Sequence, residues 1–150
     1  MDRSSGVLLV FDDDANEHAI GDKLAAALGW ARGLVRRHAF PDGETRHERC
    51  PPDLPPRVAL LRGLHDPNAK LTELLLAAAG ARELGAARLA LVCPYLAYMR
   101  QDMAFSPGEV VSQRHWVRCW PPPSTACSRS TRTCTAWRRW TCCPAGAALR

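Results

Sequence analysis

The sequence predicts an α/β domain built on a mainly parallel sheet, followed by a basic tail of a different character. Short apolar runs of strand length alternate along residues 7–93 with segments whose apolar side chains recur at helical spacing. Such alternation favours a parallel sheet covered on both faces. The chain has 150 residues, 47% hydrophobic and 23% charged, which is enough for one domain with an apolar core.

The first strand and helix are predicted at the start of the chain. Residues 7–11 form an apolar run that ends in three aspartates, which is typical of a buried strand. Asn16 is expected to cap the next helix, whose apolar positions recur at helical spacing. Gly29 is expected to end that helix.

The middle of the chain provides two further strands separated by turns and loop. Residues 34–37 form a weak strand, and residues 40–44, Phe-Pro-Asp-Gly-Glu, carry the residue types of a turn. Residues 50–56 are interrupted by prolines and are predicted as loop. Residues 58–61 are the next apolar strand.

The clearest predicted element is a helix over residues 66–84. Asp66 is placed as its cap and Pro67 as its first helical residue, with Gly85 at its end. Its apolar stripe consists of Leu71, Leu74, Leu75, Ala78 and Ala81. A near-continuous apolar strand follows over residues 88–93.

Ligands of such sheets bind beyond the carboxyl ends of the strands, so the segments after the strands are the candidate sites. These are residues 12–16, 40–44, 65–68 and 94–109. The aspartates at 12–14 suit a cation, but a lone acidic triplet is usually a solvated strand end. His65 and Asp66 open a helix, where anions bind, although a cap alone explains Asp66.

Residues 94–109 place Arg100, Gln101 and Asp102 consecutively after a buried strand. A guanidinium matches phosphate oxygens, an amide reads an adenine edge or orients a phosphate, and a carboxylate holds a metal through water. A solvated loop with a local salt bridge is the alternative.

The turn at 40–44 is a second candidate site. A purine could stack on Phe40 while Asp42 or Glu44 accepts a hydrogen bond from its amino group. The alternative is a turn whose Phe belongs to the core.

Residues 65–114 resemble the N-terminal domain of ribose-phosphate diphosphokinase, also called phosphoribosyl pyrophosphate (PRPP) synthetase. The shared features are a Leu-Leu helix, a strand that ends in Pro-Tyr, the Arg-Gln-Asp run at 100–102, and a Pro-Gly-Glu turn before a helix that contains Ser112. The Phe-Pro-Asp-Gly-Glu run at 40–44 matches a second family segment. The match is tight over residues 65–114 and looser over 1–64.

The resemblance implies an incomplete phosphoribosyltransferase-like α/β fold and a transferase of nucleotide biosynthesis in the cytoplasm. The family reaction transfers the pyrophosphoryl group of Mg²⁺-bound ATP to ribose 5-phosphate, giving PRPP and AMP. By resemblance, Arg100 and Gln101 contact ATP with support from Asp102. The turn residues Phe40, Asp42 and Glu44 hold adenine, often across a subunit interface, which implies a homo-oligomer.

The tail differs from the body in charge and composition, so we divide the chain into a domain at 1–115 and a tail at 116–150. The domain carries 14 Lys and Arg and all 15 Asp and Glu, whereas the tail has six Arg, no acid and five of the seven cysteines. It shows no hydrophobic periodicity and is expected to be disordered or poorly packed. Its cysteine spacing fits no zinc pattern.

The tail is best interpreted as an out-of-frame translation. With G/C-rich codons read one base out of register, residues 115–144 become LGALLAAAFDRVLTVDPHLHGVAAMDVLP, a helix, a strand and Asp-Pro-His-Leu-His. The family has this element there, and its histidine helps hold Mg·ATP. Because that histidine and the Thr-Gly-Gly-Thr loop for ribose 5-phosphate are absent, no metal residue is assigned and the chain is expected to be inactive by itself.

The sequence also allows two non-enzymatic alternatives. A truncated subunit could dock on full-length synthetases, or the arginine-rich tail could bind nucleic acid, which the composition makes the weaker idea. The chain has no apolar run of the length that a membrane span needs. Its first residues meet three aspartates without a small-residue cleavage site, unlike a signal peptide.

The nucleotide sequence tests the interpretation of the tail. A second open frame should run from about codon 115, encode Asp-x-His, and continue into Thr-Gly-Gly-Thr. Stop codons in that frame before the Asp-x-His codons would contradict it, and sequencing the gene decides the matter.

Overall fold

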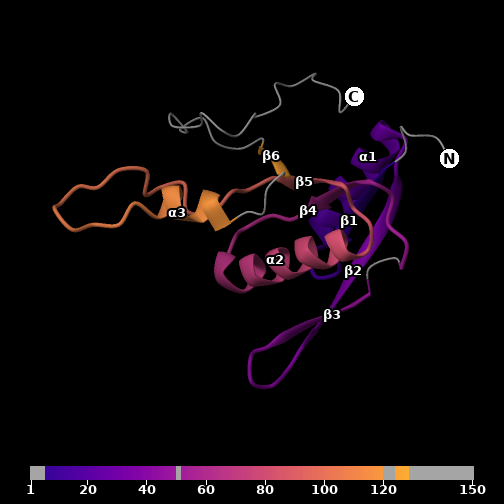
Figure 1. Ribbon diagram of the computed structural model, residues 1–150, viewed down its shortest axis with the longest axis horizontal. Coiled ribbons are helices and arrows are strands. Elements are labelled where there is room, and N and C mark those ends of the chain that lie inside the picture. The colour runs from indigo at the N-terminus through magenta and orange to yellow at the C-terminus, as the bar shows by residue number, and fades with distance from the viewer. Residues whose placement is uncertain (1–5, 50–51, 120–123, 129–150) are drawn as a thin grey trace.

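The computed structural model describes residues 6–49, 52–119 and 124–128 (Figure 1). In chain order the elements are β1 (Val7–Phe11), α1 (Ala15–Leu28), β2 (Ala31–Ala39), β3 (Thr45–Arg49), β4 (Arg57–Leu61), α2 (Pro67–Glu83), β5 (Arg88–Cys93), α3 (Ser112–Cys119) and β6 (Ser124–Ser128). The α/β class predicted from the sequence is confirmed, and the strands at 7–11 and 88–93 have the predicted bounds.

The described strands form one sheet in the order β3-β2-β1-β4-β5-β6. Neighbouring strands from β2 to β6 are parallel, and β3 pairs antiparallel with β2. From β1 the chain passes through α1 to β2 on one side, while β4 lies on the other side of β1. The strand order therefore reverses between β1 and β4, and the carboxyl ends of these two strands border the crevice where such folds bind ligands.

Two apolar cores lie on the two faces of the sheet because successive strand side chains point to opposite faces. On one face, Leu8, Val10 and Leu61 pack with α1 through Ala25. On the other face, a larger cluster that includes Leu9, Phe11 and Leu60 packs with the buried side chains of α2. The position of α2 beside the sheet is seen in Figure 1. Among the described residues, no helix is long and apolar enough to cross a membrane.

The helix ends differ from the predicted caps. The side chain of Asp14, not Asn16, caps α1 by accepting hydrogen bonds from the N–H groups of Asn16 and Glu17. Asp14 wins because it immediately precedes the first helical residue, and Asn16 is already inside the first turn. Asp66 precedes α2 as predicted but makes no side-chain cap bond and is left-handed, at φ 50°. Gly29 ends α1 in the left-handed conformation as predicted.

The buried stripe of α2 also differs from the predicted one, because Leu71 is only partly buried and Ala77 is buried as well. Leu74, Ala78 and Ala81 are buried as predicted, but Leu75 is 36% exposed. Glu73 takes its place and is 3% exposed. Apolar periodicity cannot identify a buried carboxylate, whose position depends on charged partners from other elements.

Two strands were not predicted. The polar run at 45–49 lacks apolar alternation, and it forms β3 by pairing with β2 around the turn at 40–44. In the tail, where no ordered element was expected, residues 116–119 end α3 and β6 pairs with β5. Strand pairing needs only backbone groups, and β5 offers a parallel edge. The expected disorder of 129–150 lies outside the described residues.

The two helix glycines provide a matched stability test. A Cβ on Gly21 would lie 2.6 Å from Cγ2 of Val10, a buried and stiff β-branched side chain, whereas Gly80 in α2 has open space. Gly21→Ala should lower the free energy of unfolding by about 1–3 kcal/mol. Gly80→Ala should raise it by about 0.5–1 kcal/mol. Urea unfolding measures both, and a Gly21→Ala protein as stable as wild type would contradict the close packing of α1 on β1.

Candidate functional site

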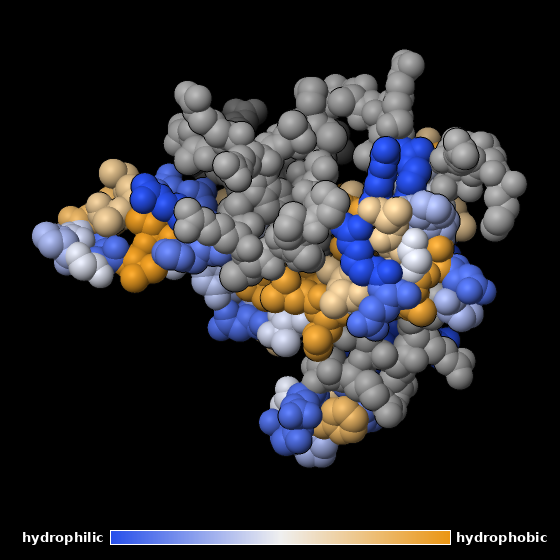
Figure 2. Space-filling view, in the orientation of Figure 1, coloured by the Kyte–Doolittle hydropathy of each residue, from blue (hydrophilic) through white to orange (hydrophobic). Residues whose placement is uncertain are grey.

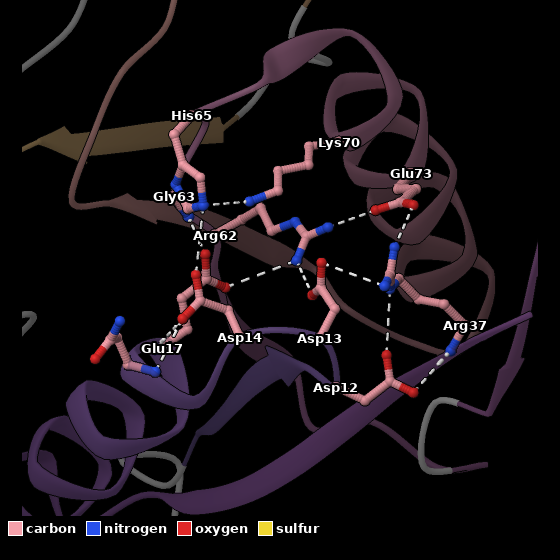
Figure 3. Close-up of polar contacts among 11 residues, drawn as sticks. Asp12, Asp13, Asp14, Glu17, Arg37, Arg62, Gly63, His65, Lys70 and Glu73 are labelled. Carbon is pink, nitrogen blue, oxygen red and sulfur yellow. Dashed lines mark hydrogen bonds and ion pairs between the residues drawn. The ribbon is translucent and has the colours of Figure 1, made fainter. Parts of the chain in front are cut away.

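A fully buried arginine lies where the strand order reverses (Figure 3). Arg62 directly follows β4, and its side chain is 0% exposed. Its Nη2 lies 2.5 Å from Oε2 of Glu73 on α2, and its Nη1 contacts Oδ1 of Asp13, just after β1. Its guanidinium also lies over the Phe11 ring, 4.4 Å from the centroid. One charge therefore joins β1, β4 and α2.

A second arginine extends the cluster to β2. Arg37 Nη1 lies 2.6 Å from Oε1 of Glu73, Nη2 lies 3.2 Å from Oδ2 of Asp13, and Nε lies 3.2 Å from Oδ1 of Asp12. The pKa of Arg37 is raised: burial lowers it, but the hydrogen bond to Glu73 and the charges of Asp13 and Glu73 outweigh burial. Glu73 thus bridges the two guanidinium groups. We use the name Arg62 cluster for the charged side chains that these ion pairs connect, which are Asp12, Asp13, Glu17, Arg37, Arg62 and Glu73.

The two carboxyls nearest Arg62 respond to it in opposite directions. Burial raises the pKa of Asp13, but the hydrogen bond and charge of Arg62 and the charge of Arg37 outweigh burial and hold it below its ordinary value. Burial raises the pKa of Glu17, and the hydrogen bond from Gly63 with the Arg62 charge offsets this only in part. The reason is distance, because Glu17 Oε2 lies 3.8 Å from Arg62 Nη1 and accepts no hydrogen bond.

A cavity of about 830 Å³ opens beside the cluster, at the start of α2. Its walls are residues 64–67, which lead from β4 into α2, and residues 95–102, which follow β5. Two of these residues, Asp66 and Tyr98, are left-handed at φ 50° and 59°. Such strained non-glycine residues cluster at ligand sites. The hydroxyl of Tyr98 donates to Oδ1 of Asn68, which ties the wall at 95–102 to the first turn of α2.

The structure places three of the predicted site residues, Arg100, Gln101 and Asp102, in the wall of this cavity. The first turn of α3 holds the middle one, because Ser112 Oγ donates to Gln101 Oε1 at 2.6 Å. His65, considered for anion binding, lies on the opposite wall. Its Nε2 is 2.9 Å from the Lys70 amine and 3.5 Å from Oδ2 of Asp14.

The other predicted group lies at the tip of the β2–β3 hairpin, which extends away from the body of the domain (Figure 1). Phe40 is 36% exposed, and its ring meets His38 edge to face at 4.8 Å. Asp42 Oδ1 accepts the Glu44 N–H at 3.1 Å, which fixes the turn. Phe40, Asp42 and Glu44 do not line the cavity. Within one described chain, the two predicted groups are therefore not brought together.

Sequence reasoning missed Arg62, Arg37, Glu73 and Glu17. One signal was present, because Arg62 follows the apolar strand Arg57–Leu61 without a break, and the three aspartates follow β1 in the same way. Parallel strands end at the same edge of a sheet. The ion pair between Arg62 and one of these aspartates could therefore have been predicted from the sequence. No such signal marked Glu73, which lies in a helix of otherwise ordinary sequence.

The sequence also matches a protein family over most of its length. Residues 9–119 match the family described as the N-terminal domain of ribose phosphate pyrophosphokinase. This chain belongs to that family. The match includes both predicted nucleotide segments and every residue of the Arg62 cluster.

Curated relatives agree with this assignment. Ribose-phosphate pyrophosphokinase of Methanopyrus kandleri is 38% identical over 100 residues, 66% of this chain and 34% of the relative. That of Saccharolobus solfataricus is 39% identical over 97 residues, 63% of this chain and 33% of the relative. The chain thus spans about a third of the length of these relatives.

The fold is shared with a solved structure. The crystal structure of phosphoribosylpyrophosphate synthetase from Mycobacterium smegmatis superimposes with a TM-score of 0.62 at 20% identity. The match covers 81% of this chain and 42% of that one. The predicted phosphoribosyltransferase-like fold class is therefore confirmed.

The described residues do not fit a magnesium site held by protein ligands. Among them, no three His, Cys, Asp or Glu side chains are grouped so as to hold a metal ion. Asp12 and Asp13 are paired with arginines instead, and a guanidinium takes the place that a cation would fill.

The raised pKa of Glu17 gives a stability prediction. The pKa of Glu17 is raised above its ordinary value of 4.5. The folded state therefore holds the Glu17 proton more tightly than the unfolded state does, and stability falls as pH rises through the raised pKa. In Glu17→Gln, which keeps the acceptor for Gly63 N–H, this loss should be absent. The free energy of unfolding of wild type relative to the variant should therefore decline from pH 4.5 upward and level off at higher pH. Urea titrations across this range test it, and parallel profiles would contradict it.

Proposed function

We propose that the domain binds ATP in the cavity beside α2, as the N-terminal part of a ribose-phosphate diphosphokinase. The observation that carries the proposal is the position of Arg100, Gln101 and Asp102 in one wall of the cavity, with Gln101 held by Ser112. Family membership supports it. Arg100 provides the cation for phosphate oxygens, Gln101 directs its amide to the nucleotide, and Asp102 supports both. The nucleotide would enter as its Mg²⁺ complex, in which the metal would neutralise phosphate charge.

We assign adenine binding to the hairpin tip, where a half-exposed Phe40 offers a ring face and Asp42 and Glu44 offer acceptors. Because the tip lies outside the cavity of its own chain, the adenine contacts come from a second copy. Exposed apolar side chains suit such an assembly: Met103, Phe105 and Val110 are 55%, 77% and 61% exposed. Figure 2 shows apolar surface over α2 and on the loop that precedes α3.

The reaction we associate with the whole protein is pyrophosphoryl transfer from ATP to ribose 5-phosphate, giving PRPP and AMP. For these 150 residues we propose ATP binding without turnover. The sequence has no Thr-Gly-Gly-Thr loop, whose N–H groups would hold the ribose phosphate. We place the protein in the cytoplasm, in keeping with its free, buried Cys93 thiol.

Calorimetric titration of the full chain with Mg·ATP tests the proposal. We expect weak binding that Arg100→Ala reduces by at least about tenfold, because a hydrogen bond to a charged group contributes roughly 1.5–3 kcal/mol and about 1.4 kcal/mol is tenfold in affinity. Arg32→Ala is the control, since Arg32 pairs with Asp22 at the other end of β2. Adding ribose 5-phosphate should cause no release of AMP. Absence of ATP binding would overturn the site, and ribose-dependent AMP release would overturn the lack of turnover.

A further inference from the structure

The Arg62 cluster joins the two segments to which we assign nucleotide contacts. Arg62 has no exposed surface, and Glu73 and Glu17 are each about 4% exposed at the side chain. Removing ionised groups from water is costly, and well-packed apolar side chains often replace buried ion pairs without loss of stability. A stabilising role alone therefore does not account for the cluster. Its position at the carboxyl ends of β1 and β4 suggests what else it does.

One arm of the cluster leads to the hairpin. β2 pairs with β1 only as far as Val35, and beyond that point the only described strand beside it is β3. Arg37 lies in this part of β2, which has no β1 partner, three residues before Phe40. Its N–H and Nε bond to the Asp12 carboxylate at 3.3 and 3.2 Å, and its Nη1 bonds to Glu73 at 2.6 Å. Because Arg62 holds the other oxygen of Glu73, it holds the carboxylate that anchors the hairpin.

The other arm leads to the cavity wall. Arg62 Nη1 faces Glu17 Oε2, and Glu17 Oε1 accepts the Gly63 N–H at 2.6 Å (Figure 3). The next N–H, that of Leu64, donates to the carbonyl of Tyr95 at 2.8 Å. Leu64 and Tyr95 begin the two walls of the cavity. Arg62 therefore reaches the wall through one ion contact and two hydrogen bonds, in addition to the peptide links that join it to Gly63 and Leu64.

We propose that Arg62 is a positioning residue for nucleotide binding: through Glu73 and Arg37 it places the Phe40 turn, and through Glu17 and Gly63 it places the cavity wall. The proposal rests on the ATP-binding function proposed above. Arg62 itself does not touch the nucleotide. Its planar guanidinium reaches carboxylates on three elements at once, which the single ammonium of a lysine cannot do.

The test uses the full chain with three variants. Arg62→Met combined with Glu73→Met replaces the central ion pair by apolar side chains, Arg62→Lys keeps the charge but loses the fork, and Arg32→Met removes a surface arginine as the control. Each protein is measured by thermal unfolding, by amide hydrogen exchange over residues 36–44 and 63–66, and by titration with Mg·ATP.

The double variant should lower the melting temperature, because Asp13 and the buried Glu17 lose Arg62 as a partner, but only modestly, since the central ion pair is replaced by apolar side chains. Amide exchange in both segments should nevertheless become faster by about tenfold or more, and ATP binding should weaken by about tenfold or more. Arg62→Lys should shift both readouts in the same direction by a smaller factor, and Arg32→Met should shift neither. An arginine with a merely structural role would change exchange and affinity only in proportion to the melting temperature.

Unchanged exchange in either segment of the double variant would overturn the proposal. Should the double variant not fold, Arg62→Lys decides: exchange and ATP affinity equal to wild type would overturn it. Failure of the wild-type protein to bind ATP would overturn the proposed function instead. The exchange measurements need no nucleotide, so the two failures are distinguishable.

Discussion

Arg62 carries a positive charge into a part of the domain from which water is excluded, and the surrounding structure is organised to compensate it. Asp13 supplies a carboxylate from the turn after β1, Glu73 from α2 and Glu17 from the first turn of α1. A buried charge without such partners would be strongly destabilising. The compensation therefore constrains three connections of the fold together: the turn after β1, the end of β4 and the packing of α2.

The same constraint explains two local irregularities. The side chain of Glu73 occupies a place in the buried stripe of α2 that periodicity assigned to a leucine, because the guanidinium groups of Arg62 and Arg37 both require it. Glu17 is buried although its ionised form is disfavoured there, since its other oxygen is the acceptor for the Gly63 N–H. Both carboxylates serve partners that are distant in the sequence.

The chain belongs to the ribose phosphate pyrophosphokinase family, and the Arg62 cluster lies between the two segments that carry the resemblance to that family. The two segments of the resemblance lie in different places, one at the tip of a hairpin and the other in the wall of a cavity. The nucleotide site that we propose is divided between these two segments, so it needs both to be held accurately against the same sheet. The Arg62 cluster contacts the base of each, and its residues come from β2, α1 and α2 and from the turns that follow β1 and β4.

The sequence by itself determined the α/β class, the bounds of β1, β5 and nearly those of α2, and the two segments of the family resemblance. These features are local: hydrophobic periodicity, turn residues and short motifs are written in consecutive positions. Only the tertiary structure decided the pairing of β3 and β6, the burial of Glu73, and the bridging of Arg37 and Arg62 by Glu73. Apart from the β2–β3 hairpin, each depends on a partner more than ten residues away, and the energy of a buried charge is set by that partner rather than by its neighbours in the chain.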